Sequence, residues 1–114
     1  MNADGVLAEQ WALHYLQRQG LRLVAQNYRS RFGEIDLMMM EGAVLVFIEV
    51  RLRRQGSFGG AAASIDYHKQ QRLIRTAQQY LSNQARTPPC RFDALIMEDA
   101  QGRNVQWFKN AFEA

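Results

Sequence analysis

Two apolar runs that carry acidic residues constrain the fold of this chain more than any other feature. They read GEIDL over residues 33–37 and FIEVR over residues 47–51. Both alternate as strands do, with successive side chains pointing to opposite faces, so Asp36 points away from the face that Ile35 and Leu37 share. A lone carboxylate is costly to bury in such a strand, and these acids therefore predict a compensating cation or partner.

A hairpin would bring the two runs side by side. Residues 41–42, Glu-Gly, lie between them and predict a short turn. With a two-residue loop there, Glu34 lies opposite Glu49, and Asp36 lies diagonal to Glu49 on the same face. A four-residue loop also keeps Asp36 and Glu49 on one face of the sheet. A loop that is one residue longer or shorter would place them on opposite faces. The pattern thus predicts carboxylates close enough to share a magnesium ion.

The acids also have plainer interpretations. Glu34 follows Gly33 at the start of a strand, where a solvated sheet rim explains it equally well. Arg51 lies on the same face as Glu49 and supplies positive charge without a metal. For Asp36 and Glu49 we favour a functional site, because clustered carboxylates with shifted pKa values often mark one.

Basic residues gather after the second run and on the helix expected next, and the candidates for nucleic-acid contact are Arg53, Arg54, Lys69, Arg72 and Arg75. On that helix Arg72 and Arg75 share one side with His68 and Gln79. Such a stripe is either an ordinary solvated face or a set of phosphate contacts. Lys69 lies nearer the buried side of that helix, where a basic residue is harder to explain as part of an ordinary solvated surface.

The order of expected elements indicates an α/β (α+β) domain with a mixed sheet of about five strands covered by helices. Helices are expected over about 4–19 and 64–84. Strands are expected over 21–28, in the acidic hairpin, and over 92–97 and 105–108, with a flexible stretch at 55–63. We expect one domain over residues 1–114.

Composition fits a globular protein and permits a nucleic-acid partner. Lysine and arginine outnumber aspartate and glutamate by 14 to 11, and the sequence pI is about 9.4. No apolar stretch approaches the ~20 residues needed to cross a bilayer, and we expect no membrane association. Asp4 and Glu9 interrupt any export signal, and the single Cys90 suits a reducing cytoplasm.

The chain resembles the YraN-like family, small uncharacterised bacterial proteins with a restriction-endonuclease-like core. The matching residues are the two acidic runs, Phe58-Gly59-Gly60, Lys69, Arg72-Leu73, Arg91-Phe92-Asp93, Trp107, Ala111 and Phe112, and, at the front, Glu9, Ala12, Leu16 and Gly20. The wider superfamily, the PD-(D/E)xK nucleases, includes Holliday junction resolvases with similar cores.

The resemblance implies that Asp36 and Glu49 ligate Mg²⁺ or Mn²⁺, with Glu9 as a helper carboxylate. From spacing alone, Glu9 is as well explained as an exposed glutamate near a helix start. The superfamily motif ends in lysine where this chain has Arg51. Arginine stays charged and cannot act as a base, although it can stabilise charge on a phosphate.

Three functions therefore remain open. The first is a metal-dependent endonuclease in which Asp36, Glu49, Arg51, Glu34 and Glu9 form the catalytic set. The second is a nucleic-acid-binding module that lost turnover when arginine replaced lysine, and the third is a protein-interaction domain with internally paired acids. As partner we expect nucleic acid, and we favour DNA over RNA, with branched DNA as one option. A homodimer is a further option for the oligomeric state.

Overall fold

The structure is a computed structural model that describes residues 3–53 and 65–114. Its elements are α1 (Ala3–Arg18), β1 (Arg22–Ser30), β2 (Gly33–Glu41), β3 (Val44–Leu52), α2 (Tyr67–Ser82), β4 (Cys90–Met97) and β5 (Gln106–Phe112). The strands form one sheet in the order β1-β2-β3-β4-β5. All neighbours are antiparallel except β3 and β4, which are parallel. This mixed α+β fold is consistent with a restriction-endonuclease-like core, as expected.

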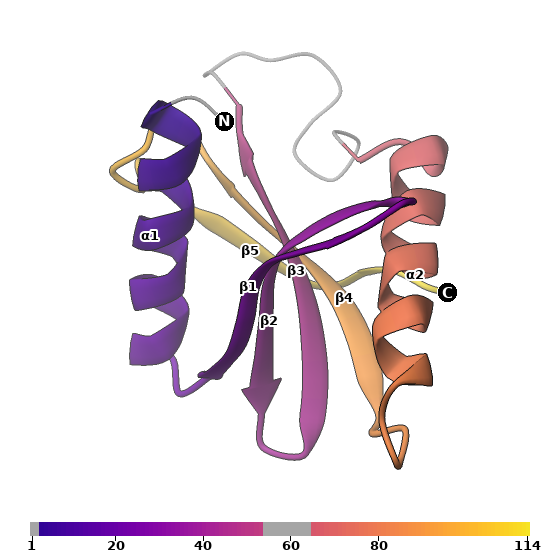
Figure 1. The fold of residues 1–114 in the computed structure, drawn as a ribbon. Coiled ribbons are helices and arrows are strands. Elements are labelled where there is room, and N and C mark those ends of the chain that lie inside the picture. The colour runs from indigo at the N-terminus through magenta and orange to yellow at the C-terminus, as the bar shows by residue number, and fades with distance from the viewer. Residues whose placement is uncertain (1–2, 54–64) are drawn as a thin grey trace.

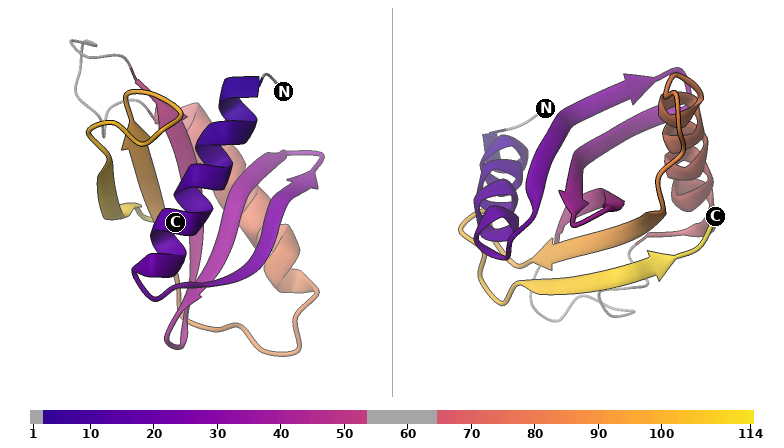
Figure 2. Two further views of the ribbon diagram at one scale, coloured as in Figure 1. Left: turned by 90° about the vertical axis from the view of Figure 1, so that its left-hand side faces the viewer. Right: turned by 90° about the horizontal axis from the view of Figure 1, so that it is seen from below.

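The two helices cover opposite faces of the sheet (Figures 1 and 2). The α1 side buries Leu16 against Leu37 and Ile48, whereas the α2 side buries Leu73 against Phe47. Because β3 and β4 are buried on both faces, they read as nearly continuous apolar runs. Their parallel pairing requires a crossover connection, in which α2 lies.

The start of α2 is fixed by a local cap. The side chain of Asp66 accepts a hydrogen bond from the backbone N–H of Lys69 at 2.8 Å, which satisfies one of the free donors of the first turn. The helix then buries Leu73, Ile74, Thr76 and Ala77. Lys69 lies one turn before Leu73, and therefore on the side of the helix that faces the sheet.

The register of the β2–β3 hairpin differs from the expected one. The turn lies at Gly42-Ala43, so that Glu41 pairs with Val44 and Leu37 with Ile48. Gly42 adopts a φ of 58°, a left-handed conformation that two-residue hairpin turns require and glycine accepts. The turn expected at Glu41-Gly42, with Glu34 opposite Glu49, was wrong, although the loop length of two residues was right.

Ile35 and Leu37, on either side of Asp36, pack under different helices. Ile35 packs in the cluster beneath α2, whereas Leu37 packs in the cluster beneath α1. The expectation that these two side chains share one face was therefore wrong. Asp36, the residue between these two apolar anchors, directly precedes the first residue of β2 that pairs with β3.

The N-terminal part of β2 pairs with β1 but not with β3. Pairing with β3 begins at Leu37, and pairing with β1 continues to Gly33. The β1–β2 hairpin thus separates from the sheet, and its tip reaches α2 (Figure 1), where Ser30 Oγ lies 3.0 Å from Thr76 Oγ1. Asp36 lies at the point where the two strands part.

The last strand is also longer than expected: β5 runs to Phe112 instead of ending at residue 108. Among the described residues, no helix is long and apolar enough to cross a membrane.

Candidate metal centre

Asp36 is held at the strand opening by the backbone of β3. Its Oδ2 accepts a hydrogen bond from the Val50 N–H at 2.8 Å. The carboxylate thus takes a donor that a continuing β2–β3 ladder would otherwise use. This bond fixes the side chain between the two diverging strands, with one oxygen left for other partners.

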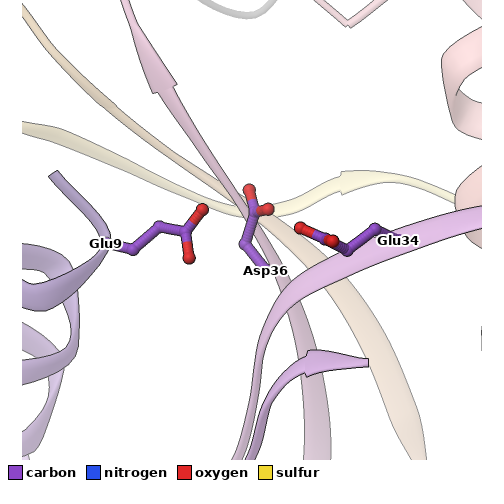
Figure 3. A group of neighbouring side chains, drawn as sticks. All are labelled: Glu9, Glu34 and Asp36. Carbon is purple, nitrogen blue, oxygen red and sulfur yellow. The ribbon is translucent and has the colours of Figure 1, made fainter. Parts of the chain in front are cut away.

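Two more carboxylates approach Asp36. Oxygens of Glu9, Glu34 and Asp36 all lie within 4.8 Å of one another, and Figure 3 shows Asp36 between the other two. Glu9 comes from α1 and Glu34 from the detached part of β2. All three side chains are partly buried. We refer to Glu9, Glu34 and Asp36 as the acid cluster.

Asn27 joins two members of the acid cluster. With its amide nitrogen facing the carboxylates, it donates to Glu9 Oε1 at 2.8 Å and to Glu34 Oε1 at 3.1 Å. Its φ of 52° is left-handed, a conformation that asparagine tolerates better than most residues. Sequence reasoning missed Asn27; the signal available was an asparagine inside an expected strand, where that residue is depleted.

Glu49 lies beside the acid cluster but already has cationic partners. Its side chain is 4% exposed, with Oε2 lying 3.2 Å from Lys69 Nζ and 3.6 Å from Arg51 Nη1. A buried carboxylate held by two cations satisfies the requirement for compensation. The expected proximity of Arg51 to Glu49 is confirmed. The expectation that Lys69 lies toward the buried side of its helix is also confirmed.

Crowding shifts the protonation of the acids. Burial, followed by the charge of Glu49, raises the pKa of Asp36 to about 9. Burial and the charge of Glu34 also raise the pKa of Glu9. Carboxylates brought together without a cation retain protons in this way, so the site has a deficit of positive charge around Asp36.

This donor set fits a hard divalent cation. Mg²⁺, Mn²⁺ and Ca²⁺ prefer carboxylate oxygens, and the acid cluster offers three side chains from two separate elements. The expected ligand pair was Asp36 with Glu49. The structure brings these two carboxyl groups together through a side-chain hydrogen bond. It also places Glu9 and Glu34 next to Asp36, whereas Glu49 additionally contacts Lys69 and Arg51.

The basic residues expected to contact nucleic acid fall into different places. Arg72 and Arg75 are exposed on α2, whereas Lys69 is partly buried against Glu49. Arg53 is partly buried, with its backbone N–H bonded to the carbonyl of Met97 at 2.8 Å. Arg54, the stretch at 55–63 and Phe58-Gly59-Gly60 lie outside the described residues.

A cavity of about 490 Å³ opens beside Glu9 and Arg51. It lies between the start of α1, the end of β3 and the turn after β4. Its other charged lining residues are acidic, namely Asp4, Glu98 and Asp99. A cation would be attracted to this side of the site more than a phosphate would.

Comparison with known sequences identifies the relatives of this chain. The family described as "Uncharacterised protein family UPF0102" matches residues 8–97. The chain belongs to UPF0102. This assignment confirms the resemblance to the YraN-like family that the acidic runs indicated.

UPF0102 proteins from several bacteria match nearly the whole chain. One from Psychromonas ingrahamii is 53% identical over 112 residues, covering 98% of this chain and 91% of its own length. One from Janthinobacterium sp. is 52% identical, with coverages of 96% and 87%. One from Nitrosomonas europaea is 52% identical, with coverages of 93% and 90%. The matched UPF0102 region includes the acid cluster, Glu49 and α2.

Proposed function

We propose that this UPF0102 protein is a divalent-metal-dependent endonuclease that acts on nucleic acid in the cytoplasm, and we favour DNA over RNA as its substrate. The observation that carries the proposal is Asp36, fixed at the strand opening among carboxylates, with its pKa raised to about 9. A cluster with this charge deficit is suited to a divalent cation and, through it, to a phosphodiester. The resemblance to PD-(D/E)xK nucleases points to the same chemistry.

Asp36, Glu9 and Glu34 would hold Mg²⁺ or Mn²⁺, and Glu49 lies next to them as the acid of the superfamily motif. When bound, such an ion supplies Lewis-acid stabilisation of phosphoryl charge and makes water a better nucleophile. The Val50 N–H keeps one Asp36 oxygen oriented, and Asn27 keeps Glu9 and Glu34 in place. Outer partners of this kind orient ligands.

Lys69 offers an ammonium group that the chain lacks at position 51. Its Nζ lies 3.2 Å from Glu49 Oε2 although it comes from α2. We assign Lys69 to positioning the attacking water, because lysine can change its protonation state where arginine cannot. Arg51, 3.6 Å from the same oxygen, would stabilise charge on the scissile phosphate.

A second candidate is a nucleic-acid-binding module without turnover, which the replacement of the motif lysine by Arg51 favours. The third candidate, a protein-interaction domain, draws support from the internal pairing of Glu49 with Lys69 and Arg51. Arg29 pairs with Glu34 in the same way, but this internal pairing does not account for Asp36 and Glu9, and we therefore rank this candidate last.

Cleavage of end-labelled single-stranded, duplex and four-way-junction DNA, and of RNA, tests the proposal. The assay uses Mg²⁺ or Mn²⁺ and compares wild type with Asp36→Asn, Glu49→Gln and Lys69→Met. A matched control is Glu41→Gln, which alters an ion-paired glutamate of β2 outside the acid cluster. We expect metal-dependent cleavage that Asp36→Asn and Glu49→Gln abolish and Glu41→Gln retains. Cleavage by Asp36→Asn at the wild-type rate, or no cleavage by wild type, would contradict the proposal.

A further inference from the structure

Three guanidinium groups lie along the side of the molecule where the β1–β2 hairpin meets α2. Arg31 belongs to the hairpin turn, and its Cζ lies 4.9 Å from the ring centre of Phe32. Arg75 of α2 lies 6.0 Å from the same ring. Arg31, Arg72 and Arg75 are all exposed. We call these three arginines and Phe32 the arginine face.

The position of Phe32 is set by the docking of the hairpin tip on α2. Ser30 Oγ accepts a hydrogen bond from the Phe32 N–H at 2.9 Å and contacts Thr76 Oγ1 at 3.0 Å. Thr76 is fully buried. Phe32 therefore rests on an anchored turn, and its ring arranges guanidinium groups from two elements that are distant in sequence.

The arginines of this face are not ion-paired within the part of the chain that the structure describes, although, after the hydrogen bond from the Lys69 N–H, the charge of Arg72 helps to lower the pKa of Asp66. Elsewhere Arg29 pairs with Glu34, Arg91 with Glu41 and Asp93, and Arg103 with Glu98. Within the described ranges 3–53 and 65–114, by contrast, Arg31, Arg72 and Arg75 form no salt bridge to a carboxylate. Their charges are thus available to an external anion.

A hollow connects the arginine face with the acid cluster. It measures about 220 Å³ and is lined by Phe32, Gly33, Glu34, Lys69, Arg72 and Leu73. Glu34 belongs to the acid cluster, and Lys69 contacts Glu49. The hollow on this side thus carries basic side chains, unlike the acid-lined cavity on the α1 side.

We infer that the arginine face binds the phosphate backbone of the nucleic-acid strand whose scissile phosphate lies at the acid cluster. This inference rests on the proposed function and adds the direction in which the strand leaves the site, along α2 instead of over α1. Arginine groups held at fixed positions bind successive phosphates without reading sequence. The surface is therefore expected to bind DNA and RNA without a sequence requirement.

Binding in the absence of catalysis tests the inference. Fluorescence anisotropy in EDTA measures the affinity for labelled single-stranded and duplex DNA, and for RNA, of about 20 nucleotides. The variant Arg31→Ala/Arg75→Ala is compared with Arg18→Ala/Arg86→Ala, which removes the same charge from two exposed arginines elsewhere. Arg18 lies in the last turn of α1, and Arg86 lies beyond the end of α2.

We expect Arg31→Ala/Arg75→Ala to weaken binding about tenfold and to lower the salt dependence by about one unit of slope per arginine. The control should stay within about twofold of wild type. The variant Arg31→Lys/Arg75→Lys keeps both positive charges and should recover much of the affinity. This recovery would show that the alanine variant loses phosphate contacts and is not misfolded.

Equal losses in the two alanine variants, unchanged binding by Arg31→Ala/Arg75→Ala, or no binding by wild type would overturn the inference. The result is separable from the proposed catalysis. If binding depends on Arg31 and Arg75 but no substrate is cut, the arginine face does bind nucleic acid and the endonuclease proposal fails. If substrate is cut but the affinity does not depend on Arg31 and Arg75, the inference about the arginine face fails and the endonuclease proposal holds.

Discussion

At the scale of single residues, Asp36 combines several effects that usually occur apart. It is partly buried, it accepts a backbone N–H from Val50, and it lies near the charges of Glu49 and Glu9. The hydrogen bond favours the ionised form, whereas burial and the neighbouring carboxylates oppose it, and the opposing effects dominate. Asp36 therefore stays protonated until a cation or high pH removes the proton.

Stability of the metal-free protein should depend on Asp36 and on pH. The pKa is about 9 in the folded state against an ordinary 3.8, so the folded state retains a proton that the unfolded chain loses. Stability should therefore fall as pH rises from about 4 to about 9, by at most about 1.4 kcal/mol per pH unit. Asp36→Asn cannot ionise, and its melting temperature should exceed that of wild type increasingly toward pH 8, by several degrees.

Glu41→Gln is the matched control for that experiment, because its effect has the opposite sign. The hydrogen bond from Arg91 lowers the pKa of Glu41, so this carboxylate stabilises the fold above its ordinary pKa and loses the effect as pH falls. Glu41→Gln should lower the melting temperature at pH 7, and its difference from wild type should shrink only as pH falls below the ordinary glutamate pKa of 4.5. Thermal unfolding at several pH values measures both variants; a pH-independent difference for Asp36→Asn would contradict the account.

Lys69 should contribute to stability through Glu49. Removing one partner of a buried ion pair leaves its charge uncompensated, although Arg51 remains at 3.6 Å. We expect Lys69→Met to reduce the free energy of unfolding by about 1–3 kcal/mol. Lys109→Met, which removes a 53% exposed lysine from Glu41, should cost less than about 1 kcal/mol. Equal losses in urea titrations of the two variants would show that Glu49 does not need Lys69.

At the scale of elements, the decisive feature is the departure of the β1–β2 hairpin from β3. The alternation of the two acidic runs sufficed to predict both strands, the hairpin and its two-residue loop. It could not place the turn, because Glu41-Gly42 and Gly42-Ala43 both contain the glycine that a tight turn requires. Nor could it predict that Ile35 and Leu37 pack under different helices, because the alternation does not show where β2 leaves β3.

Packing of the β4–β5 turn on α1 gives a prediction at this scale. Gly102 has a φ of 83°, and a Cβ there would overlap the indole of Trp11. Gly42 has a φ of 58°, with nothing within 4 Å of a Cβ. Gly42→Ala should therefore cost about 1–2 kcal/mol for backbone conformation alone.

Gly102→Ala should cost about 1–3 kcal/mol beyond that, because the indole must move. Chemical denaturation of the two variants measures the difference. A smaller loss for Gly102→Ala than for Gly42→Ala would mean that the turn does not pack on Trp11 as described.

At the scale of the whole molecule, the site is assembled from distant parts of the chain. Glu9 arrives on α1, Asp36 on β2 and Lys69 on α2. Sequence spacing predicted that Asp36 and Glu49 would be neighbours, since both lie in one hairpin. The contact between Lys69 and Glu49 and the role of Asn27 could not be predicted in this way, because they depend on how both helices pack on the sheet.

The central claim is that Asp36, Glu9 and Glu34 hold a divalent metal ion. The most direct test is a titration of the protein with Mn²⁺ at pH 8, with free Mn²⁺ measured by electron paramagnetic resonance. We predict about one bound ion per chain, lost in Asp36→Asn and retained in Glu41→Gln. Failure of wild type to bind Mn²⁺, or equal binding by Asp36→Asn, would contradict the claim.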